Sequence, residues 1–268
     1  SFGSHINALG TRVALGIHHI AKVKTYEITS ETAIFQSPYK TLTNYNIKHA
    51  VDEWLAEPVG VSATYGDNIG AWDVSGVTVM TDLFKHGRSK FNANGGEADG
   101  TLDASGFNED LSSWNTSLVT NMDWMFRGAS TFNQPLNNWN VSKVTNMAGM
   151  FRSASAFNQP LNTKDVSGLD GSTYTAWDTI LVTNMAYMFK DASRFNQDIS
   201  DWDTSSVNTM ASMFSKAYVF NQNIGAWNTS NVTNMYSMFF HAWEFNGYIG
   251  NWDTSLVNRM ESMFNGAR

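Results

Sequence analysis

The chain has 268 residues, a formal net charge of −7 at neutral pH and no cysteine. The negative charge argues against general nucleic-acid binding, and the lack of cysteine excludes disulfides, zinc thiolates and a thiol nucleophile. No apolar run is long enough to cross a membrane. The sequence starts with neither an initiator methionine nor a signal peptide, so we expect a processed product or a fragment.

Residues 1–43 do not repeat and have no assigned fold. Ala21–Ile28 alternates like a strand, and the adjacent His18 and His19 would point to opposite faces of it, which makes a poor metal pair. A hydrolase in this segment, with the rest of the chain as its targeting arm, would draw on His5, His18, His19, Ser1, Ser4, Ser30 and Ser37. The segment is too short to hold a catalytic core, which argues against this alternative.

Residues 44–71 are interpreted as a capping helix and a lead-in. Asn44–Glu57 predicts an amphipathic helix that Pro58 stops. Its apolar face consists of Ile47, Ala50, Val51, Trp54 and Leu55. Because the helix directly precedes the repeats, we expect it to cover their open end.

Residues 72–268 are a series of repeats that each begin at a tryptophan. The seven positions are Trp72, Trp114, Trp139, Trp177, Trp202, Trp227 and Trp252. Four of the six intervals are 25 residues, and the other two, of 42 and 38, contain insertions near 86–103 and 163–176. A fixed period of this length predicts a solenoid, in which each copy buries its apolar face against its neighbours.

The expected structure of one copy follows from the second. Its apolar residues have the i, i+3, i+4, i+7 spacing of one helix face, at Met122, Met125, Phe126 and Ala129. Thr120 or Asn121 would supply the N-cap of that helix, and Trp114–Val119 suits a short strand. We therefore expect an α/β solenoid, leucine-rich-repeat-like, with seven turns that each contain a short parallel strand and a short helix.

The methionines and phenylalanines of the repeats form regular rows. All thirteen methionines fall on two repeat positions, beside an equally regular row of phenylalanines, and no histidine or cysteine recurs with them. We interpret these rows as core and predict neither a metal site nor a cofactor.

Two polar rows are also predicted to be structural. An asparagine follows a phenylalanine in each copy and can bond to the backbone of the adjacent copy: Asn108, Asn133, Asn158, Asn196, Asn221 and Asn246. The Asp or Asn that follows each tryptophan predicts an Asx turn at Asp73, Asn115, Asn140, Asp178, Asp203, Asn228 and Asp253. No partner acid recurs with this second row, so it does not indicate catalysis.

The two insertions are predicted to be solvated loops. The first carries Asn94, Glu97, Asp99 and Asp103, which invite a calcium interpretation, but their spacing differs from that of the helix-loop-helix calcium motif. The second, Thr163–Ala176, is similar, and its D-V-S echoes the strand of a degenerate copy.

The sequence stops halfway through the seventh copy. The unfinished copy would expose apolar side chains that include Met260, Met263 and Phe264. We expect either that the natural chain continues, or that a partner in a multi-subunit assembly covers this C-terminal end.

The copies, W-[DN]-T-S-x-V-T-N-M-x-x-M-F-x-x-A-x-x-F-N-Q, resemble the BspA-like family of bacterial surface protein repeats, which also occur in mycoplasma lipoproteins and in protists and microalgae. The lead-in resembles that family too, at Ala50–Leu55, Ala63–Gly66 and Trp72–Thr78, so the resemblance covers residues 44–268. It implies a leucine-rich-repeat-like solenoid, an extracellular or cell-surface location, and a role in adhesion and protein binding. It carries over no catalytic residues.

Positions that vary between copies are the candidate binding surface. The thirteenth residue after the tryptophan is a cation in four successive copies, Lys85, Arg127, Arg152 and Lys190, which indicates either a solvated helix face or a basic binding strip. Large aromatic residues occupy nearby variable positions, where they either pad the core or anchor a partner: Trp124, Tyr187, Tyr218, Tyr236, Phe240 and Trp243.

The leading functional hypothesis is a non-catalytic protein-binding or scaffold module. Ice or carbohydrate-surface binding is an alternative, because Thr78, Thr120, Thr145, Thr183 and Thr233 share one repeat position. Asn208 and Asn258 break that row, which counts against ice binding. Of the four glycosylation sequons, at Asn115, Asn140, Asn228 and Asn231, only Asn231 lies off the Asx row and is the preferred candidate.

Overall fold

The computed structural model describes residues 41–56, 65–66, 68–167 and 172–268, all within one compact unit. The predictions for Ala21–Ile28, for His18 and His19, and for the serine and histidine set of the hydrolase alternative lie outside these described residues, as does the predicted helix end at Glu57.

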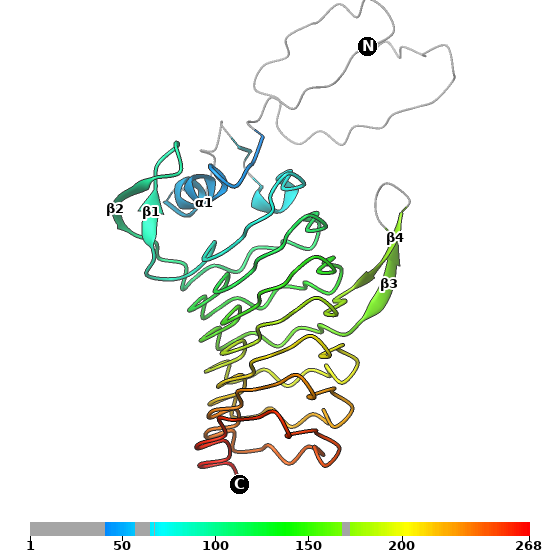
Figure 1. The fold of residues 1–268 in the computed structure, drawn as a ribbon. Helices are drawn as coiled ribbons and strands as arrows, with labels where there is room; N and C mark the ends of the chain where they lie inside the picture. Colours follow the sequence, from blue (N-terminus) through cyan, green and yellow to red (C-terminus); the bar gives the residue numbers. More distant parts are fainter. Residues whose placement is uncertain (1–40, 57–64, 67, 168–171) are drawn as a thin grey trace, which may run out of the picture. The chain divides into compact units, whose positions relative to one another are not determined.

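The predicted α/β solenoid is wrong. The described residues contain one α-helix, α1 (Ile47–Ala56), and one short 3-10 helix, η1 (Ile69–Ala71). Their strands form two separate antiparallel pairs, β1 (Ser89–Phe91) with β2 (Glu97–Thr101), and β3 (Lys164–Ser167) with β4 (Thr173–Ala176). The regular part of each copy contains neither the expected helix nor the expected strand, and is a coil of successive turns (Figure 1).

Left-handed residues prevent the predicted helix. The tenth residue after each tryptophan has a positive φ in every copy, for example Trp124 at 56° and Tyr187 at 62°. From the second copy on, the fourteenth residue has a positive φ as well, as in Ser153 at 58° and Lys216 at 59°. An α-helix needs consecutive right-handed residues, so left-handed residues at these two positions replace it with tight turns.

Backbone hydrogen bonds between copies stabilise this irregular conformation. In the second copy the amides of Met122, Trp124, Phe126 and Gly128 donate to carbonyls of the third copy, and the same alternate amides do so in each of the first six copies, at 2.7–3.1 Å. Of the amides between them, those of Met125 and Arg127 donate to the carbonyl three residues earlier, and that of Asp123 donates to the Asn121 side chain. The backbone polar groups of this segment are thus satisfied without a helix.

The parallel β-bridges between consecutive copies are limited to single residues. One residue of each copy bridges to its equivalent in the next, in a row that runs Val79, Asn121, Asn146, Asn184, Thr209, Asn234 and Arg259. The predicted strand Trp114–Val119 lies outside this row. Thr120 and Asn121 are also not helix caps: the Thr120 hydroxyl donates to Thr78, and the Asn121 side chain accepts from the Asp123 amide.

The prediction that the methionine and phenylalanine rows form the core is confirmed. Eleven of the thirteen methionines are fully buried, Met263 is nearly so, and only Met260 is exposed. Phenylalanine rings at the same repeat position stack from copy to copy at 5.4–5.7 Å between centroids, from Phe84 to Phe264. A second row, from Phe107 to Phe245, stacks beside it at 5.7–6.1 Å. Burial of these side chains is the main apolar stabilisation.

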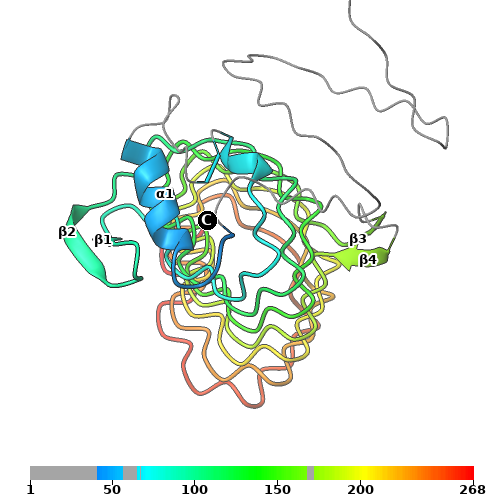
Figure 2. The ribbon, with the colours of Figure 1, turned by 90° about the horizontal axis from the view of Figure 1, so that it is seen from above.

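The two insertions form β-hairpins where solvated loops are predicted. The pairs β1–β2 and β3–β4 project from different sides of the copies (Figure 1 and Figure 2). Every residue of β2 is exposed, whereas Val166 of β3 and Tyr174 of β4 pack against the core. Because β3 pairs only with β4, and in the antiparallel sense, the D-V-S segment is not the strand of a degenerate copy.

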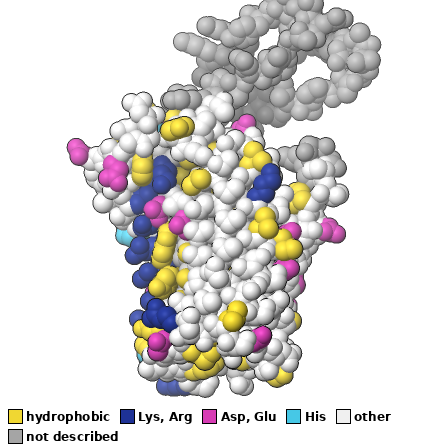
Figure 3. Space-filling model, viewed as in Figure 1, with side chains coloured by type: hydrophobic (Ala, Val, Ile, Leu, Met, Phe, Trp, Pro, Cys, Tyr) yellow, Lys and Arg dark blue, Asp and Glu magenta, His cyan; other side chains and the backbone are white. Residues whose placement is uncertain are grey.

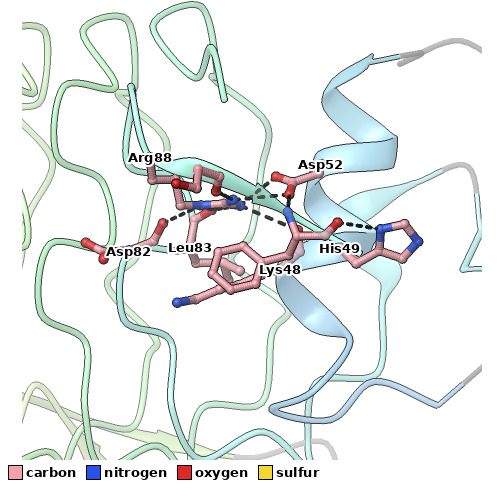
Figure 4. Close-up of polar contacts among 8 residues, drawn as sticks. Lys48, His49, Asp52, Asp82, Leu83 and Arg88 are labelled. Atoms are coloured by element: carbon pink, nitrogen blue, oxygen red, sulfur yellow. Dashed lines mark hydrogen bonds and ion pairs between the residues drawn. The ribbon is translucent and has the colours of Figure 1, made fainter. Parts of the chain in front are cut away.

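A buried ion pair joins α1 to the first hairpin and the first copy. The Arg88 guanidinium lies 2.7 Å from the Asp52 carboxylate, and both side chains are about 95 % buried (Figure 4). Arg88 also donates to the carbonyls of Asp82, Leu83 and Ser89, while Asp52 accepts from the Phe91 amide at 2.6 Å. This network fixes α1 beside the first copy, which supports the predicted position of the helix at the start of the repeats.

The Asn44 side chain occupies the place of a preceding copy. Its Oδ1 accepts from the amides of Thr78 and Val79, at 2.9 and 3.1 Å, and its Nδ2 donates to the Thr78 hydroxyl. The amide of Thr120 donates to the Thr78 carbonyl in the same row one copy later. One side chain therefore satisfies amides that have no earlier copy to bond to.

Replacing Asn44 tests whether its side chain stabilises the start of the first copy. Asn44→Ala should lower the free energy of unfolding by about 1–2 kcal/mol, because two amides lose their acceptor. Asn44→Asp keeps the acceptor and should cost less, as measured by urea unfolding. Equal losses for both variants would contradict the assignment.

Breaking the ion pair should be more costly. Arg88→Met leaves the Asp52 carboxylate buried without a counter-charge and should destabilise by about 3–5 kcal/mol. In a double-mutant cycle, Asp52→Leu combined with Arg88→Met should recover part of that loss. Additive single effects in urea unfolding would show that the two groups act independently.

Candidate functional site

The repeated polar residues are used by the architecture. The predicted Asx turn is confirmed in all seven copies, since the Asp or Asn after each tryptophan accepts from the amide two residues on. The predicted asparagine row is also confirmed, because each Oδ1 accepts from the backbone amide of the next asparagine at 2.7–2.9 Å. The indole N–H of every repeat tryptophan donates to a carbonyl of the preceding stretch, as Trp139 does to Leu111. Residues that bind a partner must therefore lie at positions of the copy other than these repeated ones.

The structure gathers five of the predicted side chains into a cation–aromatic strip, which consists of Trp124, Arg127, Arg152, Tyr187 and Lys190. The Trp124 and Tyr187 rings stack at 5.9 Å. The guanidinium groups of Arg127 and Arg152 lie 5.3 and 5.7 Å from the Trp124 ring centre. The Arg152 guanidinium and the Lys190 ammonium lie 5.8 and 5.9 Å from the Tyr187 ring centre. Lys and Arg side chains run in a column beside hydrophobic ones on this face (Figure 3).

A glycine allows the rings of the strip to meet. Trp124 and Tyr187 belong to the second and fourth copies, and Gly149 occupies the same repeat position between them. A Cβ atom at Gly149 would collide with the Trp124 indole, so this glycine leaves the space into which the indole extends. Its φ of 59° is not the decisive constraint, since Trp124 and Tyr187 adopt the same left-handed conformation.

The cations of the strip have no acidic partner among the described residues. Arg127, Arg152 and Lys190 form no ion pair there, and their side chains donate no hydrogen bond. Burial lowers the pKa of Lys190, and the positive charge of Arg152 adds to that effect. The strip therefore concentrates positive charge that no ion pair neutralises, although the Asp191 charge partly opposes it at Lys190.

Lys85, the first cation of the predicted strip, differs from the other three. Its Nζ lies 3.1 Å from the Asp82 carboxylate, so its charge is compensated. Asp123 lies in the same region, where burial raises its pKa, and burial lowers the pKa of nearby Lys48. This end of the row is a mixed-charge cluster, and the unpaired cations begin at Arg127.

The remaining predicted aromatic residues lie in the fifth and sixth copies. The Tyr218 and Trp243 rings stack at 4.2 Å, and Trp243 is 47 % exposed. The guanidinium of Arg259 lies 5.0 Å from the ring centre of the exposed Tyr236. Phe240 meets His241 edge to face at 4.2 Å. Arg259 and His241 are not among the predicted residues because they lie off the thirteenth position, although the sequence variation at their own repeat positions points to them.

A shallow cavity of about 400 Å³ lies across the last residues of the fourth, fifth and sixth copies. It is lined by Asp198, Ser200, Gln222, Asn223, Tyr248 and Asn251. The Tyr248 ring lies against Gly225 and is largely exposed, and its hydroxyl donates to Asn251. An exposed ring among amide and carboxylate groups can orient a polar ligand.

The Asn231 sequon is exposed, but its side chain is hydrogen-bonded. The Asn231 side chain is exposed, but its Nδ2, the atom that a glycan would modify, donates to the Ser205 carbonyl at 2.7 Å. Asn115, Asn140 and Asn228 use Oδ1 in their Asx turns.

The described residues were compared with the requirements of a metal site and of a membrane-spanning helix. Among them, no three histidine, cysteine, aspartate or glutamate side chains cluster as a metal site requires, and Asp103 of the calcium interpretation accepts instead from Ser105. None of the helices in the described part of the chain has the length and apolarity needed to cross a bilayer.

Comparison with known families gives one match. The family described as Mycoplasma protein of unknown function, DUF285, matches residues 38–99, 101–175 and 168–268. The chain belongs to this family. The three tandem matches agree with the repeats read from the sequence, while the resemblance to BspA-like repeats in particular is not established by them. No curated protein and no solved structure matches the chain.

The strip depends on the glycine between its rings. Gly149→Ala should displace the Trp124 indole, shift its N–H resonance in NMR spectra and cost about 1–3 kcal/mol of stability through overpacking. Trp124→Phe assigns the resonance. Gly106→Ala is the matched control, because a Cβ there meets nothing within 4 Å. An unchanged Trp124 resonance in Gly149→Ala would contradict the packing described.

Proposed function

We propose that this member of the DUF285 family is a non-catalytic protein-binding or scaffold module. Its recurrent polar groups are occupied by turns and by bonds between copies, which leaves no repeated set for catalysis among the described residues. The variable positions instead carry large aromatic side chains and arginines, which are the residues that most often anchor protein interfaces.

The cation–aromatic strip is the observation that carries this proposal. Its aromatic rings hold unpaired cations in place, so a partner that binds there meets side chains that are already ordered. The exposed Tyr218–Trp243 stack extends the candidate surface to later copies. We further propose an extracellular or cell-surface location and a role in adhesion or in a larger assembly, on the strength of the resemblance to BspA-like repeats.

Site-specific crosslinking tests the function. A photoreactive phenylalanine analogue at Trp124 or Trp243 should crosslink a discrete protein from an extract of the cells that produce this chain. The same analogue at Ile180, which is exposed and belongs neither to the cation–aromatic strip nor to the Tyr218–Trp243 stack, is the matched control. Trp243→Ala combined with Arg152→Gln should abolish capture by the analogue at Trp124, since the interface loses an anchor and a charge.

Two outcomes would contradict the protein-binding proposal. One is a turnover that a single substitution abolishes, which would indicate an enzyme. The other is binding of a sugar polymer that Tyr248→Ala removes and Trp243→Ala leaves intact. That result would assign the function to carbohydrate binding in the Tyr248 cavity, the second candidate, which its exposed ring and amide side chains favour.

A further inference from the structure

We propose that the cation–aromatic strip binds a short acidic segment of a partner protein, through the carboxylates of that segment. This inference rests on the proposed protein-binding function and names the chemistry of the partner. Arg127, Arg152 and Lys190 supply the charges, and Trp124 and Tyr187 supply the apolar faces.

The state of the cations points to an anionic ligand. The Arg127 and Arg152 side chains donate no hydrogen bond to any described residue, although each guanidinium has five N–H donors. Arg152 contacts both rings, with distances of 5.7 Å to Trp124 and 5.8 Å to Tyr187. The guanidinium groups lie over the rings, and their N–H groups, which bond to no described residue, can bind a carboxylate through two parallel hydrogen bonds.

The partial burial of Lys190 also favours binding of a carboxylate to the strip. Burial already lowers the pKa of Lys190, and its cationic neighbours Arg152 and Lys216 lower it as well, against the opposing charge of Asp191. A carboxylate placed here would relieve repulsion between like charges that the free protein tolerates. Binding would thus strengthen with the number of carboxylates that reach the strip.

The extent of the strip favours a short segment. Consecutive copies lie about 4.8 Å apart where their backbones bridge in parallel, so cations from three consecutive copies span on the order of 10 Å. Three or so residues of an extended peptide cover that length. The row of unpaired cations is bounded at one end by Lys85, which pairs with Asp82.

The charge of the whole chain disfavours a long polyanion. With a formal net charge of −7, the protein would repel those parts of a nucleic acid or sulfated polysaccharide that extend beyond the strip. A peptide with a few carboxylates places its charge only where the cations lie. The observations therefore favour a protein segment over the other two classes of polyanion.

A fluorescence-anisotropy titration with the full chain tests the proposal. The probe is a short fluorescein-labelled peptide in which glutamate alternates with glycine, and its control carries glutamine instead of glutamate. We expect saturable binding of the glutamate peptide at low salt, weakened as salt screens the charges, and none of the glutamine peptide. Arg127→Gln and Arg152→Gln should each weaken binding about tenfold.

Two matched variants give the test its specificity. Arg194→Gln removes the same charge from an exposed arginine outside the strip and should leave affinity unchanged within about twofold. Arg152→Lys keeps the charge but loses the planar fork, so its affinity should lie between those of the wild type and Arg152→Gln. Urea unfolding of each variant establishes that the fold is intact.

The proposal is overturned if the glutamate peptide fails to bind at low salt, or if Arg194→Gln weakens it as much as Arg152→Gln does. It is also overturned if heparin oligosaccharides or single-stranded DNA bind the strip more tightly than the peptide. Failure of the peptide together with a protein crosslinked at Trp124 would leave the protein-binding function standing and refute only the acidic partner. Failure of both would refute the function itself.

Discussion

Hydrogen bonds between copies, made by alternate backbone amides, are the constraint on which the structure depends. In each of the first six copies four amides donate to the next copy, while the amides between them close tight turns within their own copy. Non-glycine residues such as Trp124, Tyr187 and Lys216 adopt a left-handed conformation to allow this, at a cost of roughly 1–2 kcal/mol each. Such a conformation persists only because the adjacent copy supplies acceptors and a packed core.

The same constraint explains how the first copy is completed. An amide that has no preceding or following copy lacks a backbone partner, and Asn44 satisfies two such amides with one side-chain oxygen. The buried Asp52–Arg88 pair then holds α1 and the β1–β2 hairpin against the first copy. These contacts connect segments far apart in the sequence, so the first copy depends on residues outside the repeat itself.

Some residues of each copy maintain the fold, and others vary from copy to copy. Because the tryptophan, methionine, phenylalanine and asparagine rows are occupied by packing and hydrogen bonds, a change at any of them would disturb the neighbouring copies. The side chains at the tenth and thirteenth positions differ between copies, with Trp124 and Arg152 in one region and the buried Ser212 and Ser215 in another. Binding chemistry can vary there from copy to copy while the fold is maintained.

The sequence by itself determined the period, the buried rows, the Asx turns and the asparagine row, because each depends on side-chain chemistry that recurs at fixed spacing. It also placed Arg127, Arg152, Trp124 and Tyr187 among the variable surface residues. It did not determine the backbone: the spacing of Met122, Met125 and Phe126 fits a helix and a chain of turns equally well. Only tertiary structure decided between them, since acceptors on the next copy replace those within a helix. The cation–aromatic strip was decided in the same way, because its rings meet only across Gly149, one copy away from each.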